Sequence, residues 1–227
     1  MKTEMIKNKL VRIQSDAVEI EGMLELPEHP IGIVLFAHGS GSSRFSQRNN
    51  YVAEALRTVQ IGTLLLDLLT PKEDEEYQTR FNIPLLTQRL HAAGNWLRSS
   101  EVASLPIALF GASTGAAAAL QVAADLGDDI AAVVSRGGRP DLAGHEVLEK
   151  VTAPTLLIVG GDDTVVIDLN REAYAHLHCE KKLEIIPGAT HLFEESGKLQ
   201  TVASLAVQWC HWHFDLWNKN QRKLHVE

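Results

Sequence analysis

The sequence predicts a single α/β domain over residues 1–227, with a mostly parallel, doubly wound sheet covered by helices on both faces. Short, almost continuous apolar runs recur along the chain, as is typical of strands that are buried on both faces. Helical patterns separate these runs, so successive strands are expected to be joined by right-handed crossovers. At 227 residues and 45% hydrophobic, the chain can bury the core that one such domain needs.

The individual elements follow from the spacing of apolar residues. Residues 9–15 and 17–27 alternate polar and apolar around a turn near Ser15–Asp16, which predicts an N-terminal antiparallel hairpin. Buried strands are expected over 31–38, 61–68, 106–112, 130–135, 154–161 and 182–189, for a sheet of about eight strands. Helices are expected over 49–59, 83–100, 113–127, 168–179 and 198–217.

Three irregular segments, 39–50, 69–82 and 135–146, each follow the carboxyl end of a predicted strand. Ligands bind at this edge of an open α/β sheet. The second segment contains the charged run 72–76, which we interpret as a solvated loop.

Composition and charge narrow the function classes. A net charge of −8 and a pI near 5.7 argue against nucleic-acid binding and against anionic membranes. The first twenty residues contain no apolar core of signal-peptide length, and no run reaches the length of a membrane span, so a cytoplasmic protein is expected. Cys179 and Cys210 are too few for a disulfide framework and fit no zinc pattern, so no metal is expected.

Residues 111–115 read G-x-S-x-G, between a predicted strand and an alanine-rich helix. A serine at this position sits on a sharp, strained turn, and the glycines two residues before and after it remove Cβ atoms that would clash. This context favours Ser113 as a nucleophile over a solvated serine in a glycine-rich turn.

A serine nucleophile needs a histidine base, and the histidine needs a carboxylate that fixes its tautomer. In chains with this motif the order is serine, acid, histidine. Asp162 and Asp163 follow the predicted strand 154–161, and His191 follows the strand 182–189. Both aspartates stay open as the acid; we favour Asp163, because its spacing to Val166 matches the D-x-x-V pattern of the acid turn.

Four motifs, HGSGSS (38–43), GASTG (111–115), GGDDTVV (160–166) and GATHLF (188–193), together resemble the α/β-hydrolase superfamily, and within it the dienelactone-hydrolase-like branch. The resemblance covers nearly the whole chain. It implies the α/β-hydrolase fold with Ser113, Asp163 and His191 as the catalytic triad, and no metal or organic cofactor. The backbone N–H groups of Ser40 and Thr114 would form the oxyanion hole. His38 would order the loop that carries Ser40.

Two departures and one rejected alternative refine this prediction. Dienelactone hydrolases proper use a cysteine nucleophile, where this chain has Ser113, so the dienelactone substrate does not follow. Only a short segment separates the strands 130–135 and 154–161, so no large lid is expected. A dinucleotide-binding G-x-G-x-x-G motif fails after residue 41, because Arg44 occupies the third glycine position.

The function predicted from the sequence is hydrolysis of a small ester or lactone through an acyl-enzyme. Arg44, Arg136 and Arg139 lie in loops at the active edge, where an arginine could bind a substrate carboxylate. Arg136 is favoured because it directly follows a strand; the alternative is pairing with the run 72–76 or with Asp141. A thioesterase, acyltransferase or peptidase with the same triad, and a binding protein without catalysis, stay open.

The sequence leaves the oligomeric state open. Four aromatic residues of the last predicted helix (Trp209, Trp212, Phe214 and Trp217) could pack on the sheet or on a partner, and packing on the sheet is favoured.

Overall fold

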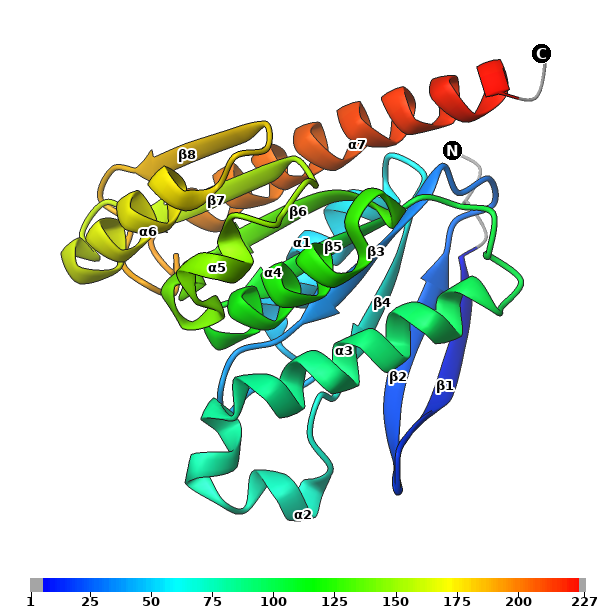
Figure 1. The fold of residues 1–227 in the computed structure, drawn as a ribbon, viewed down its shortest axis with the longest axis horizontal. Coiled ribbons are helices and arrows are strands. Elements are labelled where there is room, and N and C mark those ends of the chain that lie inside the picture. Colours follow the sequence, from blue (N-terminus) through cyan, green and yellow to red (C-terminus); the bar gives the residue numbers. More distant parts are fainter. Residues whose placement is uncertain (1–5, 225–227) are drawn as a thin grey trace.

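A computed structural model describes residues 6–224 and confirms the predicted sheet (Figure 1). The eight strands lie in the order β1-β2-β4-β3-β5-β6-β7-β8. β2 is antiparallel to both of its neighbours, and the pairs from β4 to β8 are parallel. The strands are β1 (Lys7–Ser15), β2 (Val18–Leu26), β3 (Gly32–Ala37), β4 (Ile61–Leu66), β5 (Ile107–Ala112), β6 (Ile130–Arg136), β7 (Thr155–Gly160) and β8 (Lys181–Ile186).

Helices cover both faces of the sheet because the central strands are apolar on both sides. In β3, Leu35 packs into the core under α3 (Ile83–Arg98) and α4 (Thr114–Leu126). A residue of α6 (Thr164–His176) packs into the same core. The next residue, Phe36, packs on the opposite face, under α1 (Gln47–Arg57) and α7 (Lys198–Leu224). This alternation is the period of two that a strand imposes.

Two segments expected to be irregular contain short helices. Residues 69–82 include α2 (Pro71–Asp74) and a 3-10 helix (Tyr77–Phe81), and residues 135–146 include a 3-10 helix (Pro140–Ala143) and α5 (His145–Leu148). α2 forms because Thr70 and Glu73 make a capping box and proline occupies its first turn. Part of the charged run 72–76 is therefore helical, although it stays on the surface.

Helix α6 begins at Thr164, four residues before the predicted start at 168, and ends at His176. The prediction started late because polar residues 162–164 resemble a loop, whereas here they form the turn that starts the helix.

The connection between β6 and β7 contains only the two short helices named above, so this connection forms no large lid. At the other end of the chain, Phe214 of α7 is buried against Gly32, whereas Trp212 is 58% exposed. Across residues 6–224, no helix combines the length and the apolar character needed to cross a bilayer.

Candidate active site

Ser113 stands at the sharp turn between β5 and α4. Its backbone angles, φ 50° and ψ −122°, lie in a region that residues other than glycine rarely adopt. The Ser113 N–H donates to the Arg136 carbonyl at 3.3 Å, and the Ser113 carbonyl accepts from the Arg139 N–H at 3.0 Å. β6 and the loop after it thus hold the strained residue through both its N–H and its carbonyl group. Such support from the surrounding structure is what allows a strained backbone conformation to persist.

Two glycines make this turn sterically feasible. A Cβ atom on Gly115 would lie 2.3 Å from the Ala37 carbonyl oxygen, and one on Gly39 would lie 2.9 Å from the Ser113 Cβ atom. The start of α4 and the loop after β3 therefore approach each other more closely than side chains would allow. This close approach explains Gly115 of the G-x-S-x-G motif; at the other motif glycine, Gly111, a Cβ atom would lie 2.4 Å from the Ala116 Cα atom.

Gly115→Ala is expected to lower the free energy of unfolding by about 3 kcal/mol or more, because the new methyl group meets backbone atoms that cannot turn away. Gly94→Ala in α3 is the matched control. Its Cβ atom would find its nearest neighbours at 3.9 Å, so roughly 0.5–1 kcal/mol of stabilisation is expected. Urea unfolding followed by circular dichroism measures both changes, and equal stability of the two variants would contradict this explanation.

His191 and Asp163 are in contact at the same edge of the sheet. The distance from His191 Nδ1 to Asp163 Oδ2 is 2.7 Å. A carboxylate can only accept here, so Nδ1 carries the proton and the lone pair of the neutral ring is at Nε2. Asp162, the competing acid, is exposed, and only its backbone N–H is engaged, with the Ala189 carbonyl at 3.0 Å.

A cavity of about 210 Å³ lies beside some of the predicted residues, although neither Asp163 nor Thr114 lines it. Ser113 and His191 line it, together with Gly39 and Ser40 from the loop after β3. Within residues 6–221, the N–H groups of Ser40 and Thr114 donate to no other group. A larger hollow of about 750 Å³, between β1 and α3, contains none of the predicted site residues.

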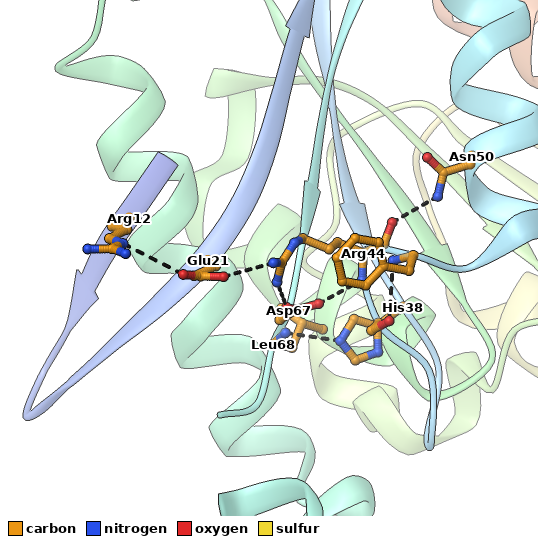
Figure 2. Close-up of polar contacts among 9 residues, drawn as sticks. Arg12, Glu21, His38, Arg44, Asn50, Asp67 and Leu68 are labelled. Atoms are coloured by element: carbon orange, nitrogen blue, oxygen red, sulfur yellow. Dashed lines mark hydrogen bonds and ion pairs between the residues drawn. The ribbon is translucent and has the colours of Figure 1, made fainter. Parts of the chain in front are cut away.

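The loop that carries Ser40 is held at its base by His38 (Figure 2). The Leu68 N–H donates to His38 Nε2 at 3.0 Å, so Nδ1 bears the proton and donates to the Gly39 carbonyl at 2.8 Å. Burial lowers the pKa of His38, so the ring stays neutral and keeps this tautomer. As expected, His38 orders the loop through hydrogen bonds.

Arg44 holds the far end of the same loop through contacts with acidic side chains (Figure 2). Its guanidinium pairs with Asp67 and, at 2.8 Å, with Glu21. The backbone N–H of Arg44 donates to Asp67 Oδ1 at 2.7 Å. Arg44 does not line the cavity beside Ser113. We therefore do not propose Arg44 as a substrate ligand. It pairs with Glu21 and Asp67, and not with the run 72–76 or with Asp141 as the sequence suggested.

Arg136 lines the cavity and is only 6% exposed. Among the described residues, the one hydrogen bond of its side chain runs from Nη2 to Asn49 Oδ1 at 3.3 Å, and its buried Nε has no partner. Burial, followed by the charge of Arg48, lowers the pKa of Arg136 to about 10, so the side chain is still cationic at neutral pH. Arg139, by contrast, pairs with Asp141 at 2.8 Å, as the alternative interpretation stated.

Arg48 is a cavity residue that the sequence analysis missed. It lines the cavity with Arg136, and its Nη1 lies 2.8 Å from Glu194 Oε1 in the segment that follows His191. Its position in the first turn of α1, directly after the loop of Ser40, was the available signal.

Comparisons with known proteins identify the family of this chain. Residues 30–209 match a family model described as an alpha/beta hydrolase domain. A dienelactone hydrolase from Anabaena variabilis is 50% identical, with a TM-score of 0.87 over 90% of this chain and 96% of that one. Est1E from Butyrivibrio proteoclasticus, at 16% identity and a TM-score of 0.78 over 91% of this chain and 99% of that one, shares the fold.

Two curated relatives from strains of Mycobacterium tuberculosis carry the name "Putative phosphoribosyl transferase". Each is 53% identical over 205 residues, which are 90% of this chain and 46% of the relative. The chain thus spans less than half the length of these relatives. Because the family model covers most of the chain and the Anabaena variabilis relative covers it at 50% identity, the protein belongs to the α/β-hydrolase family.

Proposed function

We propose that this hydrolase cleaves a small carboxylic ester or lactone through an acyl-enzyme formed on Ser113. The observation that carries the proposal is the 2.7 Å contact between His191 Nδ1 and Asp163, at a cavity that the strained Ser113 also lines. This tautomer leaves His191 Nε2 free to accept the hydroxyl proton of Ser113.

In the first step, Ser113 Oγ attacks the ester carbonyl carbon while His191 Nε2 takes the hydroxyl proton. The tetrahedral intermediate then collapses, the bond to the leaving oxygen breaks, and His191 returns the proton to that oxygen. Water repeats the sequence on the acyl-enzyme and releases the acid. Asp163 holds the ring and stabilises its charged form during both steps.

The N–H groups of Ser40 and Thr114 are the proposed oxyanion donors. Thr114 begins α4, so its N–H also lies at the positive end of the helix dipole. His38 and Arg44 hold the loop of Ser40 from its two ends. This supports a hole whose donors are positioned before substrate binds, as electrostatic stabilisation requires.

The substrate is proposed to carry an anionic group, bound by Arg136. A buried guanidinium without a carboxylate partner is costly, and a substrate anion would offset that cost. The cavity of about 210 Å³ favours a small acyl group. The 50% identical relative is described as a dienelactone hydrolase, which is in keeping with a small ester or lactone.

Arg136→Met is expected to raise KM for a carboxylate-bearing ester roughly 10- to 100-fold, the equivalent of losing a charged hydrogen bond. A neutral ester of the same size should be affected much less. The ratio of kcat/KM for the two esters measures this difference. An equal loss on both would remove Arg136 from substrate binding and leave the acyl-enzyme proposal unaffected.

We also propose that the transferase activity named for the curated relatives belongs to the part of those proteins outside the match. The match covers 46% of their length and 90% of this chain, which itself matches an alpha/beta hydrolase domain over residues 30–209.

Labelling with a fluorophosphonate probe, detected by intact mass, tests the nucleophile directly. A single adduct on Ser113 supports acyl transfer, whereas folded protein that fails to label would favour a binding protein. In unlabelled enzyme that is turning over a small ester, adding thiols, alcohols or amines separates a hydrolase from an acyltransferase, because only an acyltransferase passes the acyl group to them in preference to water.

A further inference from the structure

We propose that the free edge of β8 is the surface through which two copies of this chain pair into a two-fold symmetric dimer. Among residues 6–224, β8 is the last strand of the sheet and is hydrogen-bonded to β7 alone (Figure 1). An open edge strand offers a row of unpaired N–H and C=O groups, which another strand can extend.

The hydrogen bonds to β7 determine which groups of β8 face outward. The Thr155 N–H donates to the Glu180 carbonyl, and the Gly161 N–H donates to the Ile186 carbonyl. In a parallel ladder the even-numbered residues of β8 therefore bond to β7. The backbone groups of Lys181, Leu183 and Ile185 point to the free edge.

A second β8 related by a two-fold axis runs antiparallel, and each outward-facing residue must lie opposite another one. One register places Leu183 opposite Leu183 of the second copy and Lys182 opposite Glu184 on both sides of the axis. The neighbouring allowed registers place Lys182 opposite Lys182, or Glu184 opposite Glu184. Opposite charges stabilise a cross-strand pair and like charges destabilise it, so the sequence selects the first register.

Lysines often protect an edge strand from such pairing, but those of β8 are engaged within the chain. Lys181 Nζ donates to the carbonyls of Tyr174 and Leu177, at 2.7 and 2.6 Å, and lies over the Tyr174 ring. Lys182 pairs with Glu184 at 2.7 Å. In the selected register, Lys182 of each copy lies opposite Glu184 of the other. The four side chains form a block in which opposite charges are neighbours both along and across the strands.

The apolar surface beside these four charges fits the same partner. Lys182 borders a groove of about 170 Å³ between β8 and α7, which Trp209 and Trp212 also line. Trp212 is 58% exposed although it is large and aromatic, the kind of residue that is enriched in interfaces. Because Lys182 belongs both to the paired strand and to this groove, the second copy of the proposed dimer borders the groove, and we expect it to cover Trp212.

Light scattering after size exclusion and sedimentation equilibrium test the proposal at micromolar concentrations of the full chain. The wild-type chain is expected to be a dimer. Glu184→Lys places cations at positions 182 and 184 of both copies and is expected to weaken association at least about 10-fold. Lys182→Glu should act in the same way, and the double variant K182E/E184K, which exchanges the two charges, should restore the dimer.

Glu54→Lys makes the same charge change on the exposed side of α1, and it is expected to leave the dimer intact. Trp212→Ser supplies a second, charge-independent test and should also weaken association; circular dichroism confirms folding. A wild-type chain that stays monomeric overturns the proposal. So does a Glu184→Lys chain that dimerises as tightly as wild type.

Discussion

Ser113→Ala is expected to lower kcat for a small activated ester by about 10⁶-fold, which leaves only the rate that the remaining site supports. The loss is this large because the hydroxyl is the proposed bond-forming atom, and the alanine variant must rely on water attacking directly. The change removes one oxygen and keeps the Cβ atom that Gly39 approaches, so stability should be little affected. Discontinuous assays at high enzyme concentration measure kcat, and urea unfolding measures the free energy of unfolding.

Ser42→Ala is the matched control for this prediction. Ser42 lines the same cavity but has no role in the proposed steps, so its kcat is expected to stay within about threefold of wild type. Turnover that persists in Ser113→Ala while Ser42→Ala is unchanged would refute the nucleophile and require another route to hydrolysis.

Asp163→Asn is expected to lower kcat by about 10⁴-fold with little change in KM. An amide at this position can donate to His191 Nδ1, so the imidazole proton moves to Nε2, where the lone pair is needed. Asp162→Asn makes the same chemical change one residue earlier, on an exposed side chain, and should leave kcat nearly unchanged. Reversed effects of the two variants would identify Asp162 as the acid.

The choice between these aspartates illustrates a limit of sequence reasoning. Both follow β7 directly, and the chain pattern places either of them near the carboxyl end of that strand. What distinguishes them is the turn before α6, which directs the Asp163 side chain toward His191 and leaves Asp162 exposed. A preference for one spacing pattern anticipated this contact, but only the backbone path explains it.

Arg44 illustrates a different limit. Its partners, Glu21 and Asp67, lie in β2 and directly after β4, and the sheet order β2-β4-β3 brings these strands beside its own loop. Since spatial order differs from chain order here, the ion pairs could not be read from neighbouring residues. The buried strands were predictable for the opposite reason, because a continuous apolar run is a local property of the chain.

The cavity also depends on contacts that are distant in sequence. Arg48 lies in the first turn of α1, Arg136 ends β6, and Asn49 accepts the side-chain hydrogen bond of Arg136. Nothing in the spacing of these residues predicts that they meet.

The separation of Ser113, Asp163 and His191 along the chain also has a consequence for folding. Each of the three follows a different strand, and β5 and β7 are neighbours only through β6, so four adjacent strands must pair in register before the residues meet. Pairing of distant parallel strands is slow because loop closure precedes the contacts that stabilise it. Recovery of activity during refolding therefore reports the completed tertiary structure, and it should lag behind the recovery of helical signal from locally formed segments such as α3 and α7.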